Sequence, residues 1–194
     1  RYARQFAAPR LIVVGGLIGS GKSTLARGLA KSFGAIWLRT DEIRLTEFAR
    51  SRRANQGFSQ GIYAPHISEL VYQRLMGRAE EHLRHGLTVV CDGTFSKAAG
   101  RDTLRQLARR QRASFHFIEC AVPRTIALRR IAKRYAARAA ISEAKPEHYD
   151  RLKAGFEPVR GWPARDWTRL SDNRPADQTH QAALAALRRA WVRR

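Results

Sequence analysis

The sequence predicts an α/β fold of three layers, with a parallel sheet of about five strands between two layers of helices. Two observations carry this prediction: short, uniformly apolar, β-branched runs recur along the chain, and segments with helical spacing separate them. Strands that are apolar at every position are typical of parallel sheets covered on both faces. Strands that alternate with helices form such sheets. The strands are expected at residues 11–14, 35–38, 87–91 and 114–120, with a weaker fifth at 167–170.

Helices are expected between and after these strands, at residues 23–31, 41–53, 66–85, 97–112, 123–138, 147–154 and 178–192. In the long helix at 66–85, spacings of three and four residues define the expected apolar face. That face comprises Leu70, Val71, Leu75, Ala79 and Leu83. Residues 54–65 contain two glycines and a proline and are expected to form a loop. A loop of this length inside a compact domain is often functional.

The composition indicates one folded domain, residues 1–194. The length is that of a single domain, and 44% hydrophobic residues are enough for a sizeable core. No apolar run approaches the roughly 20 residues that span a bilayer, and the apolar stretch at 11–18 is too short for a signal peptide. A cytoplasmic protein without membrane contact is therefore expected. Residue 1 is Arg rather than Met, which leaves open a piece of a longer polypeptide or a trimmed start.

The net charge of +21, from 37 basic and 16 acidic residues, has two interpretations. One is a polyanionic partner such as nucleic acid. The other is the composition of a GC-rich genome, because the chain is also rich in alanine and never places more than two Lys or Arg in a row. The second interpretation is favoured, so nucleic acid stays a partner that is not preferred.

The segment 16–23 reads GLIGSGKS and matches the phosphate-binding pattern G-x-x-x-x-G-K-[ST]. It follows an apolar strand and begins a helix, as the mechanism requires. Glycines let such a loop turn its N–H groups toward phosphate oxygens, and the helix adds the positive end of its dipole. Lys22 is expected to reach the β and γ phosphates of ATP, and the Ser23 hydroxyl to bind Mg²⁺. The expected nucleotide-binding residues are Gly16, Gly19, Ser20, Gly21, Lys22, Ser23 and Thr24.

The run at 14–24, VGGLIGSGKST, resembles the P-loop kinase-like ATPases that include polynucleotide kinase, gluconate kinase and zeta toxin relatives. It looks closest to a bacterial group of AAA-type ATP-binding domains that often follow an aminoglycoside-phosphotransferase-like domain in one polypeptide. The resemblance extends to about residue 158 and is looser after the loop, where Leu152 stands at a position that is commonly Gln. It implies a P-loop NTPase fold with a helical lid at about 130–146, and covalent fusion to an N-terminal phosphotransferase-like domain.

The resemblance also implies an acceptor site at residues 40–44, TDEIR. In similar kinases an Asp just after the second strand, followed three residues later by Arg, faces the acceptor hydroxyl. Asp41 would then be the general base, and Arg44 would neutralise charge on the transferring phosphoryl group. From the residues alone, the alternative is that Asp41 caps a helix and Arg44 is solvated.

Two further segments belong to the implied site. Asp92 follows the strand at 87–91 in the general form of a Walker B segment and would assist Mg²⁺ or contact substrate; the alternative is an Asp in a turn. Arg130 and Arg134 are four residues apart and so share one helix face. From there they would close over the triphosphate, with Arg138 one turn further on; the alternative is a solvated basic face.

Other side chains with potential chemistry are interpreted as structural. The two cysteines, Cys91 and Cys120, end apolar runs and are expected to be buried hydrophobic residues. The late tryptophans are expected to pack the C-terminal part: Trp162, Trp167 and Trp191. Four histidines form no recognisable metal set: His66, His82, His85 and His116. In the loop after the last strand, Asn173 and Arg174 are weak candidates for contact with adenine.

Three functions stay open. The preferred one is a cytoplasmic kinase that transfers the γ-phosphoryl group of MgATP to a hydroxyl of a small-molecule acceptor. Its expected catalytic residues are Lys22, Asp41, Arg44, Arg130 and Arg134. The second is a polynucleotide 5′-hydroxyl kinase, which the net charge favours and the poor match after the lid disfavours. The third is an ATP-binding regulatory module fused to another catalytic domain.

Overall fold

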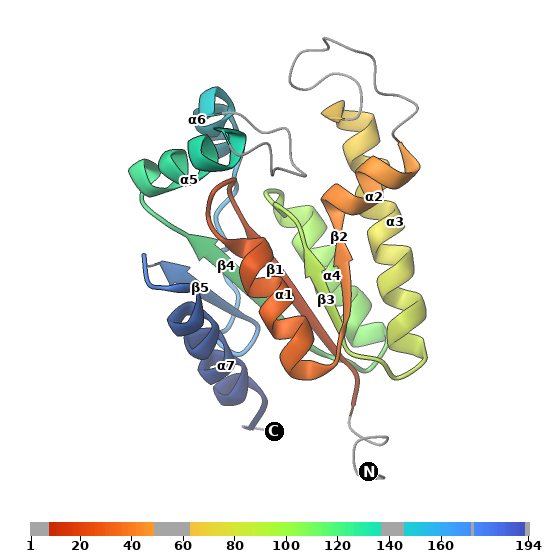
Figure 1. The fold of residues 1–194 in the computed structure, drawn as a ribbon. Coiled ribbons are helices and arrows are strands. Elements are labelled where there is room, and N and C mark those ends of the chain that lie inside the picture. Colours follow the sequence, from red (N-terminus) through yellow and green to blue (C-terminus); the bar gives the residue numbers. More distant parts are fainter. Residues whose placement is uncertain (1–7, 49–62, 137–145, 172, 193–194) are drawn as a thin grey trace.

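A parallel sheet of five strands forms the centre of the molecule (Figure 1), in the order β2-β3-β1-β4-β5. The computed structural model describes residues 8–48, 63–136, 146–171 and 173–192. The strands are β1 (Arg10–Gly16), β2 (Ile36–Arg39), β3 (Val89–Asp92), β4 (Ser114–Ala121) and β5 (Trp167–Ser171). Every pairing between neighbours is parallel. The predicted fold class is confirmed, including the weak fifth strand, which pairs with β4 at the edge of the sheet.

Helices cover both faces of this sheet. They are α1 (Lys22–Phe33), α2 (Thr40–Glu47), α3 (Pro65–Arg84), α4 (Ala98–Arg110), α5 (Arg124–Ala136), α6 (Tyr149–Ala154) and α7 (Ala176–Val192), with a 3₁₀ turn at Pro146–His148. The helices α1 and α7 pack on one face, and α3 and α4 pack on the other. In Figure 1, α5 and α6 lie together at the end of the sheet where the phosphate loop leaves β1. Among the described residues, no helix combines the length and apolarity needed to cross a membrane.

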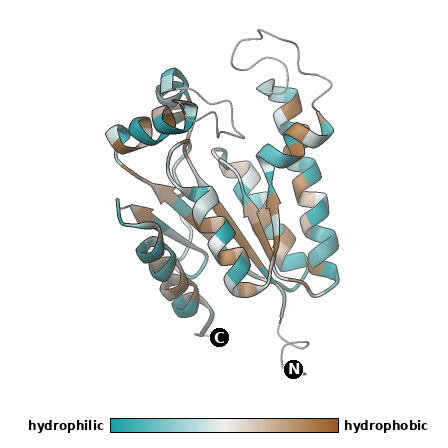
Figure 2. Ribbon diagram, in the orientation of Figure 1, coloured by the Kyte–Doolittle hydropathy of each residue, from teal (hydrophilic) through white to brown (hydrophobic). Residues whose placement is uncertain are grey.

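The central strands are apolar throughout because both of their faces are buried. Side chains along a strand point alternately to opposite faces. In β1, Leu11 and Val13 therefore join the core under α3 and α4, whereas Ile12 and Val14 join the core under α1 and α7. Figure 2 shows the result as hydrophobic strands between helices whose outer surfaces are hydrophilic. The side chains of Cys91 and Cys120 are buried in these two cores, as expected.

The buried face of α3 differs from the predicted face by one turn at its start. Leu70 is 42% exposed, whereas Ile67 is buried with Val71 and Leu75. The observed face repeats strictly every four residues, so Ile67 precedes Val71 on it and Leu70 turns toward solvent. The predicted helix at 41–53 ends at Glu47 within the described part of the chain, and residues 49–53 lie outside it. Most of the predicted loop at 54–65 also lies outside the described residues, and Pro65 already belongs to α3.

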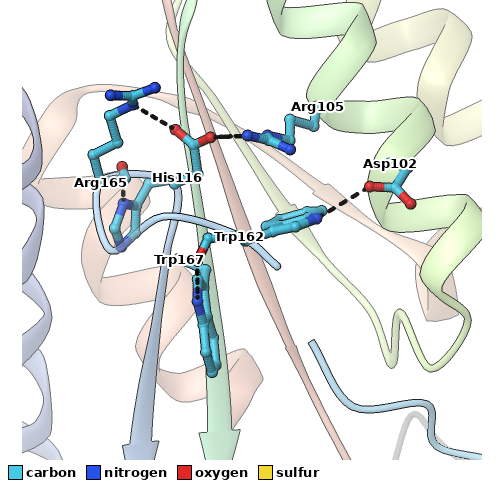
Figure 3. Close-up of polar contacts among 7 residues, drawn as sticks. Asp102, Arg105, His116, Trp162, Arg165 and Trp167 are labelled. Carbon is cyan, nitrogen blue, oxygen red and sulfur yellow. Dashed lines mark hydrogen bonds and ion pairs between the residues drawn. The ribbon is translucent and has the colours of Figure 1, made fainter. Parts of the chain in front are cut away.

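A polar cluster fixes the loop that leads into β5 (Figure 3). The indole of Trp162 donates to Asp102 of α4 at 3.2 Å, and the indole of Trp167 donates to the Trp162 carbonyl at 3.2 Å. The guanidinium of Arg105 forms an ion pair with Asp166. Trp162 and Trp167 also pack against the core under α4. These two tryptophans therefore have the packing role that the sequence predicts, and they anchor the edge strand to α4.

His116 of β4 is fully buried beside this cluster and uses both ring nitrogens. Its Nδ1 lies 2.9 Å from the Arg165 carbonyl oxygen (Figure 3), and its Nε2 lies 3.0 Å from the Thr168 hydroxyl. The carbonyl can only accept, so Nδ1 carries the proton of a neutral ring and Nε2 accepts from Thr168. Burial, which disfavours the charged ring, lowers the pKa of His116 below its ordinary value of 6.5.

This burial predicts a loss of stability in mild acid. Below pH 6.5 the unfolded chain takes up a proton at His116 that the folded protein does not, so the free energy of unfolding falls as pH falls, by up to about 1.4 kcal/mol per pH unit. His116→Asn should therefore be less stable at pH 7 but should show a shallower decline between pH 7 and pH 5. The measurement is urea unfolding at each pH. The exposed His66→Gln is the control, and a variant slope equal to that of the wild type would contradict this assignment.

Candidate functional site

The phosphate loop folds tightly between β1 and α1 because its glycines admit conformations and contacts that other residues do not. Gly19 has φ of +77°, and a Cβ there would lie 2.6 Å from the Ala127 carbonyl oxygen of α5. Gly16 has φ of +140°, and its Cβ would lie 2.3 Å from the Cys120 carbonyl oxygen of β4. Gly21 is the left-handed N-cap of α1, so the helix begins at Lys22, one residue before the predicted start. The loop is therefore built against β4 and α5.

A pocket of about 490 Å³ opens over this loop. The loop and the start of α1 line it from Gly19 to Leu25 and thus contribute Ser20, Gly21, Lys22, Ser23 and Thr24. The end of the pocket between the sheet and α7 is mostly apolar and is lined by Cys120, Leu170, Ala176 and Thr179. The described residues of the lining include no carboxylate. Basic side chains give the pocket a positive charge: Lys22, Arg130, Lys133, Arg134 and Arg174. Its size and charge suit a polyphosphate joined to an apolar ring system.

The two lid arginines named from the sequence both line this pocket from α5. The guanidinium of Arg130 lies 3.5 Å from the Gly19 carbonyl oxygen and 3.4 Å from Oδ1 of Asn173. Arg134, one turn further along α5, is exposed at the pocket mouth. Arg130 thus connects the phosphate loop to the segment after β5, where Arg174 also reaches the lining. Arg138 and residues 137–145 of the predicted lid lie outside the described residues.

Asp92 ends β3 beside the start of α1. The carboxyl group is 4% exposed, and burial raises its pKa, against the opposing effects of the Lys22 charge and the neighbouring Ser23 hydroxyl. One carboxylate oxygen, Oδ2, lies 3.8 Å from Nε of Arg39. The other, Oδ1, is buried without a hydrogen-bond partner among the described residues. The two residues named from the sequence as metal ligands, Ser23 and Asp92, therefore meet.

Asp41 and Arg44 both lie on α2, on the far side of Asp92 from the nucleotide pocket. Arg39 rather than Asp41 occupies the N-cap of α2. The negative charge of Asp41 acts to raise the pKa of both Asp92 and Tyr72, so the three side chains lie close together. Arg44 is only 6% exposed and donates to the Ser68 hydroxyl at 3.3 Å. The alternative of a solvated Arg44 is therefore wrong.

The sequence did not predict that Tyr72 and Arg101 hold the loop between β3 and α4. The amide of Phe95, a buried residue with φ of +47°, donates to the Tyr72 hydroxyl at 3.0 Å. The guanidinium of Arg101, 2% exposed, donates to the Phe95 carbonyl at 2.8 Å and to the Glu157 carbonyl at 2.8 Å. An arginine on the inner face of an otherwise amphipathic α4 is the only signal that the sequence offers for this role. The loop in turn accepts a hydrogen bond from the phosphate loop, from the Gly16 amide to the Thr94 carbonyl.

A comparison with protein families matches residues 11–159 to the model of a family described as "AAA domain". An uncharacterized protein of Mycobacterium tuberculosis is 37% identical over 114 residues, which cover 58% of this chain and 22% of that protein. The matched part of the chain thus spans about a fifth of the length of this curated relative.

Solved structures with a similar fold include kinases of small molecules. A sugar kinase from Janibacter sp. HTCC2649 superposes with a TM-score of 0.70 at 21% identity, covering 92% of this chain and 94% of that one. An APS kinase of Mycobacterium tuberculosis, solved in complex with AMPPNP and APS, gives a TM-score of 0.68 at 22% identity, covering 93% and 98%. At these identities the likeness shows the fold, which is that of P-loop kinases.

Proposed function

The chain belongs to this AAA domain family, and on that premise we propose that it is an ATP-dependent phosphotransferase acting on a hydroxyl of a small molecule. The observation that carries the proposal is the position of Asp92. Its buried carboxyl group lies beside Ser23 of the phosphate loop, and the charge of Asp41 on α2 acts on it. The phosphate loop and the proposed acceptor base thus both lie near one carboxylate. A domain that only held ATP would not need the second carboxylate.

Mg²⁺ suits the groups at this point. Oδ1 of Asp92 is buried without a partner among the described residues, and the Ser23 hydroxyl lies next to the same carboxyl group. Mg²⁺ binds hard oxygen donors of this kind, and water and phosphate oxygens would complete its coordination. Ser23 and Asp92 would hold the ion, which supplies neutralisation of phosphate charge when bound.

ATP is expected to place its phosphates on the loop, within the cationic pocket described above. The amides of residues 16–24 and the Lys22 ammonium would bind the β and γ phosphates. Arg130 and Arg134 on α5 would contact the outer oxygens and exclude water from the γ-phosphoryl group. Arg130 already contacts the Gly19 carbonyl, so a small movement of its side chain suffices.

The acceptor hydroxyl would lie between α2 and the end of β3. Asp41 would take its proton as its oxygen attacks the γ-phosphorus, while the bond from phosphorus to the β–γ bridging oxygen breaks and ADP leaves. The buried Arg44 would stabilise charge on the equatorial oxygens. Tyr72 and Phe95, with ring centroids 5.4 Å apart, would lie beside this hydroxyl, because the charges of Asp41 and Arg44 act on Tyr72.

The direct test is a screen of γ-labelled ATP with sugars, nucleosides, aminoglycosides and oligonucleotides. We expect label to transfer to one class of small hydroxyl compound, and transfer to need Mg²⁺. Slow release of label as phosphate with every acceptor, unchanged in an Asp41→Asn variant, would count against a kinase. It would favour the regulatory ATP-binding module instead.

The net charge of +21 supports a second candidate, a polynucleotide 5′-hydroxyl kinase. If genome composition explains the charge, an oligonucleotide should bind only in the non-specific range of roughly 10⁻⁴ to 10⁻⁶ M at physiological salt. Fluorescence anisotropy with a labelled 20-mer at several salt concentrations measures this. A nanomolar dissociation constant at physiological salt would overturn our preference for a small acceptor.

The matched segment covers only 22% of the length of the mycobacterial relative, which favours a domain that works within a longer protein. We propose that residues 1–194 form one such domain, joined to an N-terminal phosphotransferase-like domain. Within that arrangement the site described above would either phosphorylate an acceptor itself or regulate its neighbour through ATP binding. The Asp41 variant argued in the Discussion distinguishes these two roles.

A further inference from the structure

A second cavity, of about 430 Å³, lies behind the phosphate loop. The two cavities are on opposite faces of the sheet. Leu170 of β5 lines the nucleotide pocket, whereas Trp167 and Arg169 of the same strand line the second cavity. Alternate residues of a strand point to opposite faces, so one strand supplies a wall to each cavity. The outer side of the phosphate loop, including Leu17 and Ile18, forms the wall between them.

The cavity has walls that the fold holds in place. Its roof is α6, which is joined to α5 by two hydrogen bonds from Arg124 to Asp150, at 2.8 Å and 2.5 Å. Tyr149 of α6 is 3% exposed and packs with Ile18. On the opposite wall, Trp167 is fixed through its indole hydrogen bond to Trp162 (Figure 3). The cavity is therefore preformed and in the size range of small-molecule sites, about 300–1,000 Å³.

The lining combines aromatic rings with an excess of positive charge. Phe156, Tyr149 and Trp167 contribute rings, and the described lining holds three cations and one carboxylate: Arg124, Lys153, Arg169 and Glu119. Glu119 is paired with Arg169 at 3.4 Å, and Arg124 is engaged with Asp150. Lys153 forms no hydrogen bond or ion pair within the described part of the chain, and its charge makes a minor contribution to lowering the pKa of Asp150. One ammonium group is therefore left to meet a ligand at the rim of an aromatic cavity.

We propose that this cavity is a second small-molecule site, for a compact aromatic anion: a planar ring system that carries one carboxylate, sulfonate or phosphate group. The ring would lie against Trp167 and Phe156, and the anionic group would contact Lys153. The site is separate from the nucleotide pocket and does not depend on phosphoryl transfer. The two cavities share three lining residues: Ser20, Cys120 and Ala121. Oγ of Ser20 is buried without a hydrogen-bond partner among the described residues.

The test uses 8-anilinonaphthalene-1-sulfonate, an aromatic anion that fluoresces in apolar surroundings, titrated against the whole chain in saturating MgATP. We expect one saturable site that MgATP does not displace. Lys153→Glu should weaken it about tenfold or more, the effect of losing a charge-assisted hydrogen bond. Arg151→Glu makes the same change of charge two residues away on α6, at an exposed residue outside the lining. This control should stay within about twofold of the wild type.

A second variant, Val159→Trp, places an indole in the cavity from its half-buried edge, in the space that the ring of the probe would take. It should abolish binding of the probe while MgATP affinity and the thermal midpoint stay near the wild-type values. Equal probe affinities for Lys153→Glu and Arg151→Glu would overturn the proposal, and so would stoichiometric displacement of the probe by MgATP. If the chain binds no MgATP, the proposed kinase function is wrong. The comparison of Lys153→Glu with Arg151→Glu still tests the second site in that case.

Discussion

Replacing Lys22 with alanine is expected to weaken MgATP binding and to reduce phosphoryl transfer by more than about 10²-fold. Lys22 is the first residue of α1 and lines the nucleotide pocket. Its ammonium would neutralise negative charge on the β and γ phosphates. It would also stabilise the charge that develops between them during transfer. Removing one preorganised group of this kind typically costs about 10²–10³ in rate. Calorimetric titration with MgATP and a turnover assay on the same preparation measure both effects.

Lys31→Ala is the matched control, because it removes the same charge from the exposed end of the same helix. It should bind MgATP like the wild type. The variant at Lys22 should also stay folded, since its side chain belongs to neither of the hydrophobic cores. Equal affinity and equal activity in Lys22→Ala and the wild type would remove the phosphate-loop assignment altogether.

The phosphate loop and the order of elements could be predicted because their determinants are local. The loop needs glycines at fixed offsets from one lysine, and β1 needs side chains that are apolar on both faces, so both are visible in a few consecutive residues. The exact face of α3 was harder. Ile67 and Leu70 are equally apolar, and only the packing of α3 on the sheet decides which of them is buried.

The rest of the site depends on contacts between distant segments. Arg101 holds the loop after β3 through carbonyls of residues 95 and 157, and such acceptors leave no pattern in a sequence. The burial of Arg44 arises in the same way, because Ser68 comes from another helix. The meeting of Ser23 with Asp92 could be anticipated, since β1 and β3 are neighbours in a parallel sheet and both residues follow at its carboxyl edge.

Asp41→Asn is expected to leave MgATP binding almost unchanged while acceptor-dependent turnover falls by about 10²–10⁴-fold, the usual value of general-base assistance. This corresponds to roughly 3 to 5.5 kcal/mol in the activation barrier. Asparagine keeps the shape of the side chain but cannot accept the hydroxyl proton. Asp41 is outside the lining of the nucleotide pocket, so the affinity for MgATP should not depend on it.

The same variant separates a general base from a structural carboxylate. A carboxylate that only supports the first turn of α2 through its charge would take no part in the chemistry, so that role predicts nearly normal turnover. The exposed neighbour Glu42→Gln removes one negative charge from the same first turn of α2 and should remain active. Arg44→Ala should slow the chemical step and weaken acceptor use, but its burial means that a thermal melt must accompany the assay. Once the screen has identified an acceptor, normal turnover in Asp41→Asn would exclude the general base and shift the preference to an ATP-binding regulatory module.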